Sequence, residues 1–298
     1  MTTAASPVET SIETPLEIAH RGRDRGFWPL VWFGGPLLFI ALISIAAPLL
    51  PIPSPNEQDL ADTLQPPVYF GGTWDHPLGT DKLGRDLLSQ LIYGGRLTLL
   101  IGVVGMLVAI IPGTILGLLA GYRRGAWDIV ISRLIDSVLA LPFVLIAIAI
   151  ITNRGASISA LLIVLALTGW AQCARIVRAE TLGLRERRFV LGLRAAGASN
   201  FGIAVRHILP NLSGIIVVVA TLQIGTVILI ESALSYLGLG VPPPSITWGS
   251  ILAGGKDVLT EAWWITTWPG LMITLVVLLV NLLGDALLTF FDPKKRKY

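Results

Sequence analysis

Residues 97–122, LTLLIGVVGMLVAIIPGTILGLLAGY, contain no Asp, Glu, Lys or Arg. An α-helix needs about 20 predominantly apolar residues to cross the hydrocarbon core of a bilayer, so this stretch predicts a membrane-spanning helix. Uncharged runs of similar length recur at residues 27–52, 155–174, 212–230 and 262–284. Together these runs predict that the chain is a polytopic membrane protein.

The amino-acid composition supports a membrane location. The 298-residue chain is 53% hydrophobic and 14% charged, with a mean hydropathy of +0.74, whereas about a quarter of the residues in a soluble domain are charged. A further uncharged run, residues 137–153, reaches spanning length only if residues 128–136 extend it as one helix. Counting this run, we predict an all-α, polytopic fold with six transmembrane helices.

Polar tails flank the predicted membrane domain. Residues 1–26 carry Glu9, Glu13 and Glu17 ahead of three arginines, and we expect them to form a disordered cytoplasmic tail. The apolar run that follows is too long for the core of a signal peptide, so we interpret it as a retained anchor. The sequence divides into the tail 1–26, a transmembrane domain 27–293 with an extracytoplasmic segment 53–96 and a cytoplasmic segment 185–211, and a basic cytoplasmic tail 294–298.

The distribution of basic residues predicts the orientation. If the amino terminus lies inside, most of the 22 Lys and Arg residues fall in cytoplasmic segments. An excess of Lys and Arg marks the cytoplasmic side of a membrane protein, so we expect both termini in the cytoplasm. The net charge of +3 then reflects topology, and we expect no nucleic-acid partner because such a partner needs a basic stripe on a soluble face.

Residues 191–211, LGLRAAGASNFGIAVRHILPN, form a polar, cationic stretch between two apolar runs. Three good helix formers precede Gly197, and glycine readily takes the left-handed conformation that ends a helix. Ser199 or Asn200 can cap a second helix, which is expected to stop at Pro210 because proline has no backbone donor. The pattern predicts a compact helical knob on the cytoplasmic side.

Several kinds of active site are not expected. The single cysteine, Cys173, excludes an internal disulfide and a cysteine-based zinc cluster. His20, His76 and His207 lie in separate segments without paired ligand spacing, so we expect no metal site. The sequence has no Gly-x-x-x-x-Gly-Lys-Ser/Thr phosphate loop. We therefore expect no enzymatic activity and no cofactor bound by this chain, and any ATP must be hydrolysed by another chain.

Five ordered motifs carry a resemblance to a known family. They are residues 76–86 (HPLGTDKLGRD) with 95–99, residues 120–122 with Arg133 and Asp136, residues 197–211, residues 231–240 (ESALSYLGLG) with 248–249, and residues 281–285 with 292–293. Over about residues 27–293 the chain resembles the second permease subunit of peptide-type ABC importers, which include dipeptide, oligopeptide and nickel systems. The resemblance implies the ABC importer type I permease fold.

The resemblance also implies a coupling role for the cytoplasmic stretch. In such permeases the EAA loop docks into a groove on an ATPase subunit, although here the opening Glu-Ala-Ala falls on Leu191, Gly192 and Leu193. A rigid element that contacts both chains can transmit a movement driven by ATP binding. The residues expected to couple to the ATPase are Arg194, Ala195, Ala196, Gly197, Ala198, Ser199, Arg206, His207, Leu209 and Pro210.

The partners follow from the same resemblance. A second homologous permease subunit would complete the translocation path, and two cytoplasmic ABC ATPase subunits would bind ATP and Mg²⁺. An extracytoplasmic substrate-binding protein would deliver a short peptide, with nickel or another small polar solute as the alternative cargo. The complex would lie among the lipids of the cytoplasmic membrane of a prokaryote.

Ionisable residues inside the spans are costly and usually face protein or water. Glu231 and Ser232, at the end of the fifth run, and Asp136 are candidates for the translocation path or gate, although Glu231 can equally be a hydrogen-bonded helix-end anchor. Asp136 can also pair with Arg133, three residues earlier on one helix face. A proton-coupled secondary transporter would use Glu231, Asp136 and Asp285 as relay groups, but these carboxylates lie near span ends, which disfavours it.

The knob and the outer segment each have a second interpretation. The knob can be a hairpin that binds anionic lipid headgroups through Arg187, Arg188 and Arg206. The outer segment can meet a soluble binding protein, or it can form an interfacial helix capped by Thr80 or Asp81.

Two further interpretations concern the spans. Trp263, Trp264 and Trp268 are typical of an interfacial aromatic belt. An intramembrane hydrolase would need a catalytic histidine, paired aspartates or a metal within the spans, and the nearest histidine, His207, lies in the knob.

Overall fold

The computed structural model describes residues 15–291, with side chains from 28 to 290. Within this range five helical segments are long and apolar enough to cross a membrane, and a bent pair of helices makes up to six. The fold of the described residues is all-helical apart from one isolated bridge between Thr80 and Asp86. The long helices are α1 (Pro15–Ala46), α2 (Leu87–Arg123), α5 (Ile158–Arg185), α8 (Leu209–Tyr236) and α10 (Trp264–Phe291).

The bent pair replaces the single helix predicted over residues 128–153. Helix α3 (Ala126–Ala140) and helix α4 (Phe143–Arg154) meet at an angle of 82°. The break follows from Pro142, since a residue before proline is pushed out of the helical region, and Leu141 is extended with φ −83° and ψ 130°. The prediction of one continuous third span is therefore wrong.

Helix α1 also differs from the prediction. It begins at Pro15, so the prediction of a disordered tail is wrong for residues 15–26, which are helical. The apolar part of this helix and the short turn after it form a candidate span over Trp28–Leu49, which agrees with the predicted anchor. Residues 1–14 and the basic tail 294–298 lie outside the described residues.

Close packing of α2 against α5 depends on a row of glycines four residues apart. A Cβ atom on Gly113 would lie 2.7 Å from the Cβ of Cys173, and one on Gly117 would lie 2.6 Å from the carbonyl oxygen of Ala174. A Cβ on Gly121 would lie 2.7 Å from the Cβ of Thr181. Small residues at this spacing let two helix backbones approach closely in a membrane, and this contact holds the central pair of helices together.

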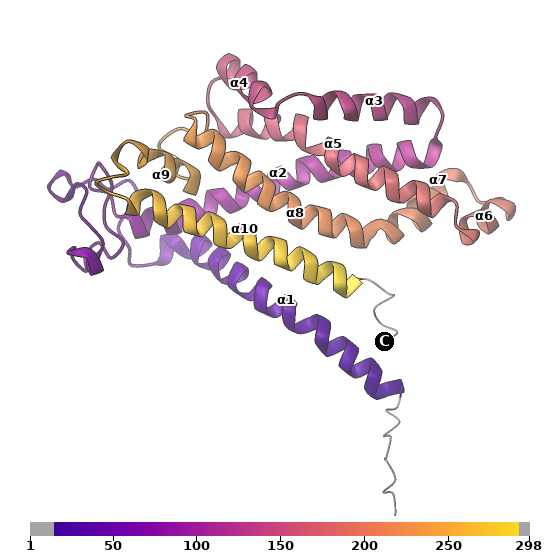
Figure 1. The fold of residues 1–298 in the computed structure, drawn as a ribbon, viewed down its shortest axis with the longest axis horizontal. Coiled ribbons are helices and arrows are strands. Elements are labelled where there is room, and N and C mark those ends of the chain that lie inside the picture. The colour runs from indigo at the N-terminus through magenta and orange to yellow at the C-terminus, as the bar shows by residue number, and fades with distance from the viewer. Residues whose placement is uncertain (1–14, 292–298) are drawn as a thin grey trace, which may run out of the picture.

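The remaining long helices pack around this pair. Helix α8 contacts α10, α2 and α5, α1 runs along α10, and α3 lies over α2 and α5 (Figure 1). The chain before α2 and the short helix α9 (Trp248–Gly254) lie at one end of the bundle, which we call the outer end. The short helices α6 (Arg188–Ala195) and α7 (Asn200–Ile203) lie at the opposite end, toward which α10 ends (Figure 1).

Candidate functional site: the coupling segment and the outer network

The coupling segment, residues 185–211, contains the predicted glycine turn. Helix α6 ends in a Schellman motif, in which the Gly197 N–H donates to Arg194 O and the Ala198 N–H donates to Leu193 O, both at 3.0 Å. Gly197 has φ +80°, a left-handed conformation that costs an L-residue about 1–2 kcal/mol. The predicted turn at Gly197 and the short helix before it are confirmed, with α6 beginning earlier in the chain than expected.

The second helix does not stop at the proline. Ser199 caps α7 by accepting a hydrogen bond from the Gly202 N–H at 3.1 Å, and the helix then runs through a π-helical turn at Ala204–Ile208 into α8. Pro210 lies in the first turn of α8. The π turn changes the backbone hydrogen-bond pattern just before Pro210, which has no backbone N–H to donate. The helix therefore continues past the proline, as one segment over Asn200–Tyr236.

Tyr122, at the end of α2, fastens the coupling segment to the bundle. Its hydroxyl donates to the Asn200 side-chain oxygen at 3.0 Å, and its carbonyl accepts from the Arg185 guanidinium at 2.7 Å. The guanidinium of Arg194 lies 5.3 Å from the ring centroid, within the range of a cation–π contact. One residue of α2 therefore contacts both halves of the knob, a role that no local sequence signal indicated.

The knob buries one face and exposes the other. Val190, Ile203 and Ile208 are fully buried against the bundle, whereas Phe201 is 79% exposed and Leu191 is 51% exposed. Large exposed apolar side chains on a cytoplasmic element are candidates for contact with a partner. Phe189 and Val205 add to this surface, which we call the apolar patch: Phe189, Leu191, Phe201 and Val205.

The predicted coupling residues surround this patch. Seven of them are exposed at the surface: Ala195, Ala196, Gly197, Ala198, Ser199, Arg206 and Pro210. Arg194, His207 and Leu209 are half-buried. The sequence interpretation concentrated on the glycine turn and the cations and did not identify the apolar members of the patch, although large apolar residues in a polar stretch were the signal for them.

Ion pairs join α3 to α5 near the coupling segment. Asp136 pairs with Arg175 at 2.9 Å and not with Arg133, so the intrahelical pair predicted from the sequence is wrong. Asp128 accepts from Arg178, and Arg124 pairs with Glu186. Side chains on the neighbouring helix offered Asp136 a closer partner than its own helix did, and sequence spacing cannot reveal such a partner.

Glu231 lies in a buried hydrogen-bond network at the outer end of α8. It is 0% exposed, and its Oε1 accepts hydrogen bonds from the hydroxyls of Ser235 at 2.8 Å and Thr247 at 2.7 Å. Ser232 donates to the Ile228 carbonyl in its own helix at 2.8 Å. These contacts are those of a helix-end anchor, while a role of Glu231, Ser232 or Asp136 in a translocation path stays a prediction.

The same network fixes α9. Thr247 caps α9 in a reciprocal capping box with Ser250. Trp248 donates its indole N–H to Leu91 O at 2.8 Å and its backbone N–H to the Thr98 hydroxyl at 3.0 Å. A Cβ on Gly249 would lie 2.6 Å from the Ser232 Cα, so only glycine allows this approach. Helices α2, α8 and α9 are thereby locked to one another.

The outer motif 76–86 folds into a tight turn that leads into α2. Asp86 caps α2 by accepting from the Ser89 N–H at 2.7 Å and also lies 3.1 Å from His76 Nδ1. The predicted interfacial helix capped by Thr80 or Asp81 is therefore wrong, because the helix begins at Leu87 after a different cap. The hydroxyl of Thr80 instead accepts from the Gln65 N–H at 2.8 Å.

The three tryptophans do not form a uniform aromatic belt. Trp264 is buried and donates its indole N–H to the Thr80 carbonyl at 3.1 Å, so it joins α10 to the outer turn. Trp263 packs edge to face on Phe70 with ring centroids 5.1 Å apart. The outer chain segment thus covers the start of α10, and tertiary contact overrides the interfacial preference of tryptophan.

A family comparison identifies the class of this chain. Residues 113–297 match the family described as "Binding-protein-dependent transport system inner membrane component". The chain belongs to this family, and it is a multi-pass membrane protein with the helical fold of ABC importer permeases. The resemblance inferred from the motifs is confirmed.

Individual relatives carry names that refer to peptides. The chain is 42% identical to the di/tripeptide transport system permease protein of Pseudomonas aeruginosa over 264 residues, covering 87% of each chain. It is 36% identical to the dipeptide transport system permease protein of Haemophilus influenzae, covering 96% of this chain and 99% of the relative. A putative peptide transport system permease of Brucella suis is 40% identical, covering 87% of this chain and 85% of the relative.

Proposed function

We propose that this chain is the membrane permease subunit of an ATP-driven importer of short peptides. The observation that carries the proposal is the apolar patch, because Phe201 and Leu191 are exposed on a rigid knob at one end of the bundle. Exposed apolar side chains on such a knob are suited to contact with an ATPase subunit. The names of the relatives, all at 36–42% identity, support peptides as the cargo.

The partners follow from what this chain provides and what its sequence lacks. The sequence contains no phosphate loop, so two ABC ATPase subunits bind ATP and Mg²⁺, and one of them docks on the coupling segment of this chain. A second homologous permease completes the path. A substrate-binding protein delivers the peptide, in keeping with the family description as binding-protein-dependent.

The orientation places the coupling segment in the cytoplasm. Arg187, Arg188, Arg194 and Arg206 all lie in this segment, as expected for the cytoplasmic side. Helix α10 ends toward the same end of the bundle (Figure 1), which supports a cytoplasmic carboxyl terminus. The outer turn and α9 then face the extracytoplasmic side.

The helix that follows the knob provides a mechanical connection across the membrane. The segment Asn200–Tyr236 is 37 residues long, which corresponds to about 55 Å at 1.5 Å per residue. Its first residues include Phe201 and Val205 of the apolar patch. Near its other end, Glu231 accepts a hydrogen bond from Thr247, the residue that caps α9. A displacement of the ATPases that moves α7 is therefore transmitted along α8 toward its anchored outer end. ATP binding closes the ATPases and opens the path outward, and hydrolysis resets it.

The experiment that tests the proposal is purification of the chain with the products of its neighbouring genes, followed by reconstitution in lipid vesicles with the binding protein. We expect copurification of a second permease and ATPases, and ATP-dependent uptake of a labelled dipeptide. Uptake driven by a proton gradient without ATP, or ATP-driven uptake of Ni²⁺ but not of the peptide, would contradict the proposal.

A further inference from the structure

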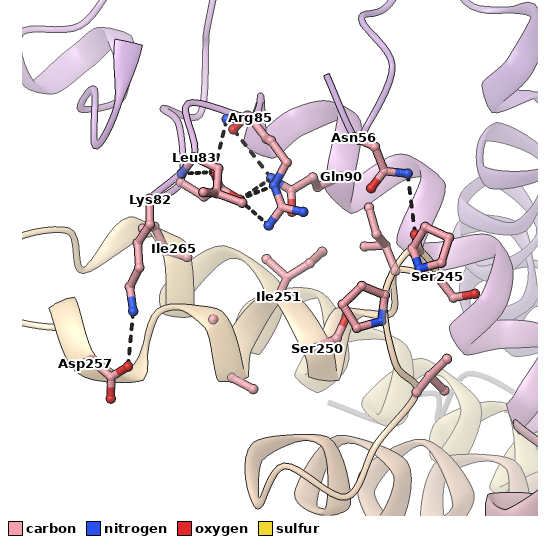
Figure 2. Close-up of a pocket in the computed structure, with 17 residues that line it drawn as sticks. Asn56, Lys82, Leu83, Arg85, Gln90, Ser245, Ser250, Ile251, Asp257 and Ile265 are labelled. Atoms are coloured by element: carbon pink, nitrogen blue, oxygen red, sulfur yellow. Dashed lines mark hydrogen bonds and ion pairs between the residues drawn. The ribbon is translucent and has the colours of Figure 1, made fainter. Parts of the chain in front are cut away.

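A polar cavity lies at the outer end, between the turn that precedes α2 and the segment that contains α9 (Figure 2). Its volume is about 420 Å³, within the range of about 300–1,000 Å³ that small-molecule sites occupy. Ile246, Ile251 and Ile265 provide apolar surface, and charged side chains from both segments line the remainder. The cavity therefore combines an apolar lining with groups of both charge signs.

The turn on one side of the cavity is held rigidly. Asp81 accepts hydrogen bonds from the Leu83 and Arg85 N–H groups at 2.8 and 3.0 Å, and its other oxygen accepts from the Arg85 and Gln90 side chains at 2.7 and 3.1 Å. Gly84 has φ +69°, and a Cβ there would lie 1.7 Å from Asp59 O. The turn is thus organised before any ligand arrives, which lowers the entropic cost of binding.

Lys82 and Asp257, which both line the cavity, form an ion pair drawn in Figure 2, with 3.2 Å between Nζ and Oδ2. Their side chains are 37% and 69% exposed. An exposed ion pair of this kind contributes little to stability, so its exchange for other partners costs little. The Lys82 ammonium has three donors and Asp257 has two acceptor oxygens, which leaves capacity for further hydrogen bonds.

We propose that this cavity is a binding site for a zwitterionic peptide of two or three residues, in which Lys82 binds the terminal carboxylate and Asp257 binds the terminal ammonium. A zwitterion carries one charge of each sign. When Lys82 and Asp257 exchange each other for the peptide termini, each of them therefore still has an opposite charge beside it. The apolar lining suits the side chain of the peptide. This inference rests on the proposed function and adds a substrate site within this chain.

The position of the cavity connects it to the long helix. Ser250 lines the cavity and forms the capping box with Thr247, whose hydroxyl donates to Glu231 in α8. One residue, Thr247, therefore connects the cavity-lining Ser250 to the helix whose other end carries the knob. A peptide in the cavity lies beside the element that the ATPases move.

The test is photolabelling of the complete complex of permeases and ATPases in lipid nanodiscs, without the binding protein. The probe is alanyl-p-benzoylphenylalanine with free termini, and labelled positions are mapped by mass spectrometry. We expect labelling of residues 241–257 or 56–90, reduced about fivefold by Lys82→Gln or by Asp257→Asn, as the loss of one exposed charge contact implies. Lys256→Gln is the matched control, since Lys256 is an exposed neighbour outside the cavity, and it should leave labelling unchanged.

A second probe with an acetylated amino terminus and an amidated carboxyl terminus should label weakly in every variant. Equal labelling by both probes would overturn the proposed peptide site. So would labelling that neither Lys82→Gln nor Asp257→Asn reduces. The labelling is repeated with the binding protein added. Labelling that appears only then, and is the same for both probes, would show that the cavity contacts that protein and would also overturn the proposed peptide site. A complex that assembles and transports the peptide but is not labelled contradicts only this inference, whereas failure of ATP-driven uptake contradicts the proposed function.

Discussion

Side chains at the two ends of the bundle find their partners in different ways. At the outer end, charged and polar groups find partners within the chain, as Asp81, Asp86 and Trp264 do. At the coupling end, Tyr122 provides a small set of attachments, while Phe201 and Leu191 are exposed. The outer end also exposes large apolar side chains, such as Tyr69 and Trp74, so the two ends differ in how their polar groups are held and not in exposed apolar surface.

This difference indicates that the outer end is held rigidly within the chain, whereas the coupling end is available for contact with another chain. The long segment Asn200–Tyr236 joins both ends, so one of its ends must be anchored for a push at the other to be transmitted. Glu231 supplies the anchor through two buried hydrogen bonds. The knob supplies a contact surface that can be covered by another chain.

The largest expected effect is at the anchor. Glu231→Ala removes the acceptor for the buried hydroxyls of Ser235 and Thr247, and we expect a loss of about 3 kcal/mol in the free energy of unfolding. Thermal or chemical denaturation of the purified complex measures it. Glu261→Ala, an exposed glutamate at the same end, should change stability little. A Glu231→Ala complex as stable as the wild type would show that Glu231 does not anchor the outer end of the helix.

The next effect is at the apolar patch. Phe201→Ala should leave the bundle folded, because the side chain is 79% exposed, but should weaken ATPase binding by about 2 kcal/mol, or about 30-fold, if it acts as an interface anchor. Binding of the purified ATPases to nanodiscs that contain both permeases measures it. Trp74→Ala, which truncates a 73% exposed aromatic at the outer end, should not change ATPase affinity. Equal effects of both substitutions would show that the two ends do not differ in this respect.

A smaller effect is expected at the glycine turn. Gly197→Val forces a β-branched residue to φ +80° and should cost about 1–2 kcal/mol locally. We expect ATP hydrolysis to continue with less peptide transported per ATP. Gly183→Val is the control, since Gly183 lies in α5 outside the coupling segment and has open space around its Cβ position among the described residues. An unchanged ratio of transport to hydrolysis in Gly197→Val would contradict a coupling role for the turn.

The smallest effect is expected at the outer cap. Asp86→Ala removes the acceptor for the Ser89 N–H at the start of α2 and should cost about 1 kcal/mol of stability. ATPase affinity should not change, because the cap lies at the opposite end of the bundle from the knob. Differential scanning fluorimetry measures the stability of Asp86→Ala. The control is Asp75→Ala, which replaces an exposed aspartate nearby. Loss of ATPase affinity in Asp86→Ala would contradict the independence of the two ends.

Local features were predicted best. The five long uncharged runs became long helices, because the cost of exposing backbone groups to lipid favours helices whatever the neighbours are. Gly197 and Ser199 occupy the expected turn and cap, since both depend on residues within one turn of the chain. The α3–α4 break was missed because the length of the uncharged run outweighed the local effect of Pro142.

Contacts between distant segments could not be read from spacing. Asp136 pairs with Arg175 and not with its own helix, Tyr122 holds the knob from the end of α2, and Trp264 is covered by the outer turn. In each case the competing partner lies on another helix, and only the packed bundle brings the two together. The apolar patch was likewise missed because exposure depends on which face packs.

Apolar run length, motif order and local backbone preference were enough to predict the membrane class, the permease family and the place of the glycine turn. Three other features emerged only from the packed helices: Glu231 is a buried anchor, the long helix continues through Pro210, and Lys82 and Asp257 line one cavity. The physical reason is that burial, hydrogen-bond partners and cavities are properties of helices packed against one another.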